Sequence, residues 1–196
     1  MSESRVIFTL VERIWHWVQA VSMVILALSG ISMHWPDYSI FSTLKSASNI
    51  HHIFGYVVTV NFVIWLIYMI ATKRIKQYMP QKHDEYPMGI FKQAKYYLFE
   101  IYTKKEHPYP VSPERRLNPM QKLAYIQVMF LAMPAQMITG FILMGSGTSM
   151  KMALIIHGVL ALFFVLFIVG HIYLATTGHT PLAYFKEMIT GKFEDH

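Results

Sequence analysis

The run of residues 152–177, MALIIHGVLALFFVLFIVGHIYLATT, constrains the fold of this chain more than any other stretch. It can cross a membrane as a helix, because a hydrocarbon core about 30 Å thick needs roughly 20 residues at about 1.5 Å each. The run carries two histidines, His157 and His171, among almost entirely apolar neighbours. Ionisable side chains inside a membrane are costly and usually face the protein interior, where they pair or bind something. The run therefore predicts a membrane helix with two functional side chains.

The spacing of His157 and His171 predicts two sites stacked through the membrane. The two residues are 14 positions apart (171 − 157). At about 100° per residue this separation is about 40° short of four full turns, so both rings leave the same face of the helix. At about 1.5 Å per residue they are roughly 21 Å apart along its axis, one toward each side of the membrane.

Three further apolar runs are long enough to span a membrane. The chain is 54% hydrophobic and only 14% charged, a composition typical of membrane proteins. We therefore expect an all-α integral membrane protein, a four-transmembrane-helix bundle that forms one domain over residues 1–196. The predicted spans are about 14–35, 50–72, 123–144 and 152–177. Within the third span, Pro134 and Gly140 predict a kink.

The distribution of positive charge predicts the orientation of these spans. Eleven of the seventeen lysines and arginines lie between residues 73 and 122. By the positive-inside rule this loop is cytoplasmic, which places both termini on the cytoplasmic side of a bacterial or archaeal inner membrane. The segment 88–102, MGIFKQAKYYLFEIY, has the spacing of a helix lying in the membrane interface, with an ordinary solvated helix as the alternative. The net charge of +6 is thus explained by topology, and no nucleic-acid recognition motif accompanies it.

The chain has no cysteine. This excludes disulfides, cysteine-ligated iron–sulfur clusters and covalently attached c-type heme within the chain. Any electron carrier in it must be a non-covalent cofactor.

The predicted topology arranges four histidines as two pairs. His16 and His171 lie toward the cytoplasmic side, and His51 and His157 toward the outer side. Two imidazoles from different helices at one depth are what a low-spin b-type heme needs as axial ligands. A zinc ion would require about four ligands, and no third ligand is evident at either level.

The ligand at the start of the second span is open between His51 and His52. Gly55 lies four residues after His51 and three after His52, which favours His51 only weakly. His34 and His179, near the ends of the first and fourth spans, are predicted to be interfacial.

A heme-free membrane anchor or a small transporter is the alternative class of function. The histidines would then act in proton relay or in packing. Transporters usually show internal repeats and helices broken at mid-membrane, whereas no repeat is evident in this sequence and its histidines lie toward the two sides rather than at the midplane.

A set of short motifs in fixed order carries a resemblance to a known family. The motifs are HW at 16–17, ALSGIS at 27–32, IHHIFG at 50–55, LNPMQK at 117–122, TGFIL at 139–143, LIIH at 154–157 and GHIY at 170–173. Over nearly its whole length the chain resembles the cytochrome b (gamma) subunits of the membrane-bound formate dehydrogenase N, nickel–iron hydrogenase and thiosulfate reductase group. One departure is His52, where formate dehydrogenases often have proline.

The resemblance implies two b hemes, one held by His16 and His171 and the other by His51 and His157. It also implies partner subunits: an iron–sulfur electron-transfer subunit and a separate catalytic subunit. The chain would then be the electron-transfer subunit of a quinone-linked oxidoreductase. Our hypothesis is that electrons move between the iron–sulfur partner at the outer face and the quinone pool.

A site for menaquinone or ubiquinone beside the cytoplasmic heme is also implied, where Asn118 and Gln121 match the family's polar positions and His171 borders the pocket. Judged from the residues alone, the favoured interpretation is structural: Asn118 is a turn residue and Gln121 an early-helix polar residue. Arg13, one turn before His16, is a candidate contact for a heme propionate or a positive-inside anchor.

Overall fold

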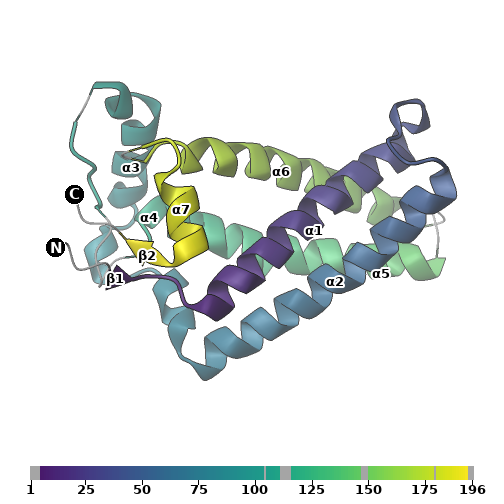
Figure 1. The fold of residues 1–196 in the computed structure, drawn as a ribbon, viewed down its shortest axis with the longest axis horizontal. Helices are drawn as coiled ribbons and strands as arrows, with labels where there is room; N and C mark the ends of the chain where they lie inside the picture. Colours follow the sequence, from purple (N-terminus) through teal and green to yellow (C-terminus); the bar gives the residue numbers. More distant parts are fainter. Residues whose placement is uncertain (1–4, 104, 111–115, 147–149, 179, 194–196) are drawn as a thin grey trace. The chain divides into compact units, whose positions relative to one another are not determined.

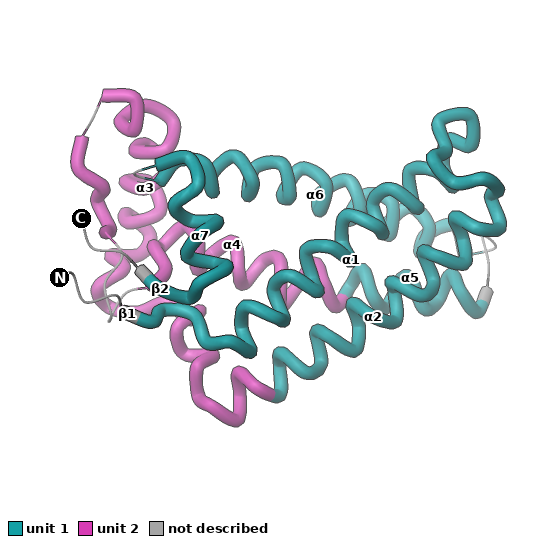
Figure 2. The backbone as a smooth tube through the Cα atoms, viewed as in Figure 1, with its two compact units in different colours: residues 1–67, 135–196 teal, residues 68–134 magenta. Residues whose placement is uncertain are grey.

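The computed structural model describes residues 5–103, 105–110, 116–146, 150–178 and 180–193. Two compact units make up the chain (Figure 2). Unit 1 comprises residues 1–67 and 135–196, and unit 2 comprises residues 68–134. The single domain expected from the sequence stays a prediction.

Four helical stretches are long and apolar enough to cross a membrane (Figure 1). They are α1 (Leu10–His34), α2 (Leu44–Ala71), the continuous stretch Pro119–Gly145, and α6 (Lys151–Ala175). The expected four-transmembrane-helix bundle is thereby confirmed. A short 3-10 helix, η1 (Pro36–Tyr38), follows α1.

The first helix begins four residues before the predicted span. Thr9 is its N-cap: Glu12 N donates to Thr9 Oγ1 at 3.2 Å, and Thr9 N donates to the Glu12 carboxylate at 2.7 Å. This reciprocal capping box satisfies two backbone N–H groups that would otherwise lack partners at the helix start. The polar cap therefore extends the helix beyond the apolar run that predicted it.

The third membrane-length stretch changes its helical form along its length. It consists of α4 (Pro119–Tyr125), the π-helical segment η5 (Ile126–Ala132) and α5 (Met133–Ser146). Proline has no N–H and its ring crowds the carbonyl of the fourth preceding residue, so a helix must adjust just before it. The interruption expected at Pro134 takes this π-helical form, whereas α5 continues through Gly140.

In unit 1, α1 and α2 pack through a mixed aromatic and polar contact. The rings of Trp15 and Trp65 stack with centroids 5.3 Å apart, and Trp65 is fully buried. Asn61 donates to Gln19 Oε1 at 2.9 Å and to the Trp15 carbonyl at 3.1 Å. Side-chain hydrogen bonds of this kind hold helices together where apolar surface alone gives little preference between lipid and protein.

The two ends of the described chain meet in unit 1. The tail contains the helix α7 (Ala183–Thr190), which ends at Gly191 with a φ of 78°. A Cβ there would lie 2.6 Å from the Phe8 carbonyl oxygen, so glycine is required. Beyond it, β2 (Lys192–Phe193) pairs antiparallel with β1 (Arg5–Val6), a contact not predicted from the sequence.

Unit 2 contains the basic loop. Its elements before α4 are η2 (Arg74–Tyr78), η3 (Lys82–Asp84), α3 (Met88–Leu98) and η4 (Glu100–Thr103). The helix expected over 88–102 is thus formed by α3 and η4, and its position at the membrane interface stays a prediction.

Candidate functional site

Four histidines of unit 1 form two pairs across different helices. The rings of His16 on α1 and His171 on α6 have centroids 6.1 Å apart, with an angle of 54° between their planes. The rings of His51 on α2 and His157 on α6 have centroids 6.2 Å apart, with an angle of 67°. Three helices therefore supply two ring pairs of nearly equal separation, at the residues that the sequence grouped together.

Neither His52 nor His34 joins these pairs. His52 is exposed, whereas the neighbouring His51 is partly buried and faces His157. His34 contacts the ring of Trp35, with centroids 4.3 Å apart. His179 lies outside the described residues.

Hydroxyl groups from adjacent helices contact the His51–His157 pair. Ser29 Oγ lies 2.9 Å from His51 Nδ1, and Thr139 Oγ1 lies 3.0 Å from His157 Nδ1. In addition, Gln136 Nε2 lies 3.2 Å from His157 Nε2. Sequence reasoning assigned no role to these three residues, because their contacts depend on how the helices are rotated against each other.

The His16–His171 pair has aromatic surroundings instead. The ring of Phe167 stacks on that of His171 at 5.8 Å with an angle of 13°, and Trp17 meets His16 edge-on at 5.3 Å. His16 Nδ1 is buried and has no hydrogen-bond partner among the described residues.

Arg13 contacts the C-terminal end of α7. One of its terminal nitrogens donates to the Ile189 carbonyl, and Trp17 Nε1 donates to the Met188 carbonyl at 3.3 Å. Cations and N–H donors at a helix C-terminus stabilise its unpaired carbonyls. Arg13 therefore tethers α7 to α1, a role that sequence reasoning did not propose, and its contact with a propionate stays a prediction.

Asn118 and Gln121, in unit 2, form the N-terminal capping box of α4. Gln121 N donates to Asn118 Oδ1 at 2.8 Å, and Asn118 N donates to Gln121 Oε1 at 3.0 Å. Asn118 Nδ2 also donates to the Tyr97 hydroxyl at 3.0 Å. The structural role of both residues is thus clear, whereas their role in a quinone site and its closeness to His171 stay predictions.

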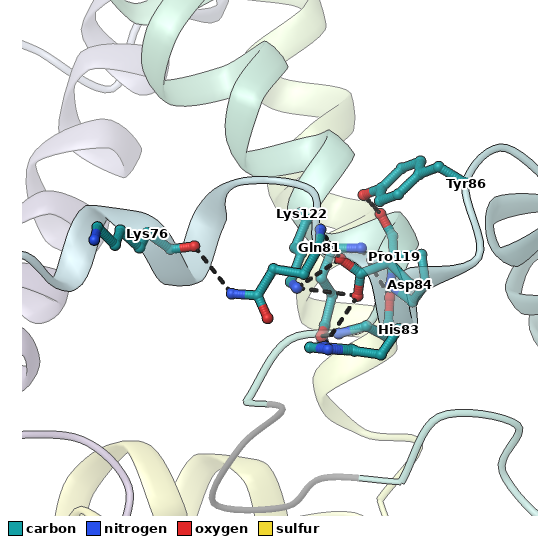
Figure 3. A network of polar contacts seen from close by, with 9 residues as sticks. Lys76, Gln81, His83, Asp84, Tyr86, Pro119 and Lys122 are labelled. Carbon is teal, nitrogen blue, oxygen red and sulfur yellow. Dashed lines mark hydrogen bonds and ion pairs between the residues drawn. The ribbon is translucent and has the colours of Figure 1, made fainter.

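A buried ion pair lies one turn further along α4 (Figure 3). Lys122 Nζ lies 2.7 Å and 3.0 Å from the two carboxylate oxygens of Asp84, and both side chains are almost fully buried. The Tyr86 hydroxyl donates to the Pro119 carbonyl at 2.7 Å. Burial and the neighbouring Asp84 carboxylate raise the pKa of Tyr86 above its ordinary value.

The described residues contain no group of three or more histidine, aspartate or glutamate side chains that could hold a metal ion. Four histidines form the two pairs described above. A pair cannot complete the tetrahedral ligand set that zinc requires, but it matches the two axial positions of a heme iron.

The fold and the histidine pairs define a multi-pass membrane protein with paired imidazoles between its helices. The sequence pattern of the prokaryotic cytochrome b561 family matches residues 7–191, so the chain belongs to that family. It is therefore a membrane cytochrome with b-type heme as its cofactor, which leaves the heme-free alternative without support.

Two relatives show how far the similarity extends. The chain is 30% identical over 188 residues to the putative cytochrome YdhU of Escherichia coli (strain K12), covering 91% of this chain and 70% of the relative. It is 26% identical over 145 residues to a probable Ni/Fe-hydrogenase B-type cytochrome subunit of Cupriavidus necator, covering 70% of this chain. The chain spans only 57% of the second relative's length.

The ring separation in both pairs matches that of two imidazoles that would hold one iron atom between them. For each imidazole, the metal would be about 2 Å from the ring nitrogen, and that nitrogen is about 1 Å from the ring centroid. Two imidazoles on opposite sides of one metal would therefore have centroids about 6 Å apart. The observed separations are 6.1 Å and 6.2 Å. Both pairs therefore have the spacing that two axial imidazoles need.

Proposed function

We propose that this protein binds two b hemes, one through His16 and His171 and one through His51 and His157. The observation that carries the proposal is the nearly equal separation of the two ring pairs, 6.1 Å and 6.2 Å, contributed by only three helices. Since His157 and His171 are 14 residues apart on one continuous helix, the two levels are about 21 Å apart along it. This distance suits stepwise electron transfer across a membrane.

Bound heme would supply reversible one-electron exchange at each level. The chain's own contribution is to position the imidazoles and to limit the access of water. Gln136 donates to the His157 nitrogen that would bind iron, so its side chain must turn aside when that position is occupied. Arg13, at the His16 end of α1, is the candidate partner for a heme propionate.

We further propose that the protein passes electrons between an iron–sulfur partner subunit and menaquinone or ubiquinone. The description of the Cupriavidus necator relative as a hydrogenase cytochrome subunit supports a complex with a catalytic subunit. The sequence motifs that resemble those of formate dehydrogenase gamma subunits support a complex of the same general plan. The basic loop of unit 2 supports a cytoplasmic location for that loop and for both termini.

The proposed quinone site includes Asn118 and Gln121. Quinone reduction needs hydrogen-bond donors at the two carbonyl oxygens and a supply of protons. Both amides remain donors while their oxygens serve the capping box, because each side chain has an NH₂ group in addition to its carbonyl. This dual capacity supports a binding role beside the structural one.

Heme quantification in purified single variants tests the heme proposal. Wild-type protein is expected to contain two b hemes per chain by its pyridine hemochrome spectrum. His157→Ala and His171→Ala should each lose one heme, since each removes an axial ligand of a different pair.

His52→Ala and His34→Ala are the matched controls and should keep both hemes. One heme per wild-type chain, or loss of heme in His52→Ala but not in a His51→Ala variant, would overturn the assignment.

A further inference from the structure

The two histidine pairs differ in what contacts their Nδ1 atoms. His51 Nδ1 lies 2.9 Å from Ser29 Oγ, and His157 Nδ1 lies 3.0 Å from Thr139 Oγ1. Both hydroxyl-bearing residues are buried, with 0% of Ser29 and 7% of Thr139 exposed. In this pair, each imidazole is therefore hydrogen-bonded at Nδ1 to a hydroxyl on a neighbouring helix.

The hydrogen of each hydroxyl is already committed to a backbone carbonyl. Ser29 Oγ donates to the Ile25 carbonyl at 2.7 Å, and Thr139 Oγ1 donates to the Ala135 carbonyl at 2.8 Å. A hydroxyl has one hydrogen and two lone pairs, so in this arrangement each oxygen presents a lone pair to its imidazole. The matching arrangement of both rings has the proton on Nδ1 and the lone pair on Nε2, the atom free to bind iron.

The Gln136 contact independently indicates the same tautomer for His157. The amide nitrogen of Gln136 lies 3.2 Å from His157 Nε2. An amide NH₂ group can only donate, so Nε2 must accept. The lone pair is therefore on the nitrogen that faces away from Thr139.

A glycine follows each hydroxyl residue and lies against the same ring. A Cβ at Gly30 would be 3.5 Å from the facing histidine's Cε1, and one at Gly140 would be 3.3 Å from the corresponding atom of its histidine. We call the dipeptides Ser29-Gly30 and Thr139-Gly140 the hydroxyl–glycine cradles. In each cradle the glycine lets the ring approach the helix, and the hydroxyl oxygen is the hydrogen-bond partner of Nδ1.

The other pair has no such cradle among the described residues. His16 Nδ1 is buried without a hydrogen-bond partner, and His171 stacks on Phe167. The two pairs thus have matching ring separations but different hydrogen bonding behind the rings.

We propose that the hydroxyl–glycine cradles are positioning elements that lower the reduction potential of the heme held by His51 and His157. This inference rests on the proposed function. A hydrogen bond from Nδ1–H to an acceptor makes the imidazole a stronger electron donor to the metal. Stronger donation favours ferric over ferrous iron, so two such bonds lower the potential of that heme alone.

Potentiometric titration of the full chain in lipid nanodiscs, followed by the heme absorption bands, tests the inference. Ser29→Ala and Thr139→Val remove the hydroxyls with little change in side-chain size. At a fixed potential each is expected to raise the ferrous-to-ferric ratio of one heme about threefold to tenfold. A tenfold change corresponds to about 59 mV for one electron. The affected heme is identified as the one lost in His157→Ala.

Matched variants separate hydrogen bonding from packing. Ser29→Thr and Thr139→Ser retain a hydroxyl and should keep the wild-type potential. Ser32 is the control on the same helix, because it is also buried and donates to the Leu28 carbonyl at 2.8 Å but forms no hydrogen bond with a histidine among the described residues. Ser32→Ala should leave both potentials unchanged.

The outcomes distinguish this inference from the proposed function. Wild-type protein without two hemes would refute the proposed function. Two hemes whose reduction potentials are unchanged in Ser29→Ala and Thr139→Val would refute the role of the cradles but not the proposed function. An equal shift of the reduction potential in Ser32→Ala would do the same. If a hydroxyl-lacking variant loses heme, the low-spin ferric EPR signal of its conservative partner is measured. An altered signal in Ser29→Thr or Thr139→Ser would then overturn the inference, and a wild-type signal would support it.

Discussion

In unit 2, the ammonium group of Lys122 lies 2.7 Å from a carboxylate oxygen of Asp84 (Figure 3). Both residues are buried, with 2% of Lys122 and 0% of Asp84 exposed. Removing one partner of a buried ion pair leaves an uncompensated charge, which costs about 3–5 kcal/mol. We therefore expect Lys122→Met to lower the free energy of unfolding by about that amount.

Lys92→Met is the control for this prediction. Lys92 pairs with Glu85, but both side chains are about half exposed, and such pairs contribute little to stability. Unfolding in detergent micelles, followed by circular dichroism, compares the two variants. Equal loss of stability in both would contradict a special contribution from the buried pair.

The raised pKa of Tyr86 predicts a stability change at alkaline pH. In the unfolded chain a tyrosine loses its proton near pH 10, whereas in the folded protein burial and Asp84 hold the proton to higher pH. Between these two values the folded state binds more protons than the unfolded state, so stability falls as pH rises. Thermal unfolding at pH 8 and pH 10.5 should show a larger decrease for wild type than for Tyr86→Phe. The same decrease in both proteins would exclude Tyr86 as its source.

Gln121 allows the capping role to be separated from the proposed quinone role. Gln121→Glu retains an oxygen that can accept from Asn118 N, and glutamate suits this position of a capping box, but it lacks the NH₂ donor. We expect Gln121→Glu to unfold like wild type while its quinone reductase activity falls at least tenfold. Gln121→Ala should lose activity and also about 1 kcal/mol of stability.

Stopped-flow reoxidation of the reduced cytochrome by a soluble quinone analogue provides the measurement of activity. Full activity in a stable Gln121→Glu protein would leave only the capping role.

Gly140 is expected to be essential for heme binding at the His51–His157 pair. A Cβ there would lie 3.3 Å from His157 Cε1, and the two methyl groups of valine would displace the ring further. Gly140→Val should therefore lose one of two hemes. A Cβ at Gly145, on the same helix, would meet no atom within 4 Å among the described residues, so Gly145→Val should retain both. The ratio of heme to protein decides between these results, and equal heme content in the two variants would contradict the role of Gly140.

The spans and the histidine pairs were predictable because they depend on length, hydropathy and helical periodicity alone. The choice between His51 and His52 was not, since it depends on how α2 is rotated against its neighbours. The same holds for Ser29 and Thr139, whose partners lie 22 and 18 residues away on other helices. The structure places His51, and not His52, opposite His157.

The capping box of α4 could be predicted from the sequence, whereas the buried ion pair of unit 2 could not. Asn118, Pro119 and Gln121 form a recognisable helix-start signature, an N-cap residue, proline at the first position and glutamine at the third, so their capping box was accessible to sequence reasoning. Asp84 and Lys122 are 38 residues apart and share no local pattern. Their pairing depends on tertiary structure within unit 2.

The pairing of β1 with β2 has a consequence for membrane topology. Arg5–Val6 and Lys192–Phe193 are hydrogen-bonded neighbours, so we expect the polypeptide to return to the membrane face from which it started. An even number of crossings between them is then expected, in agreement with the four candidate spans. Reporter tags fused near either end should consequently respond to the same compartment, whichever compartment that is.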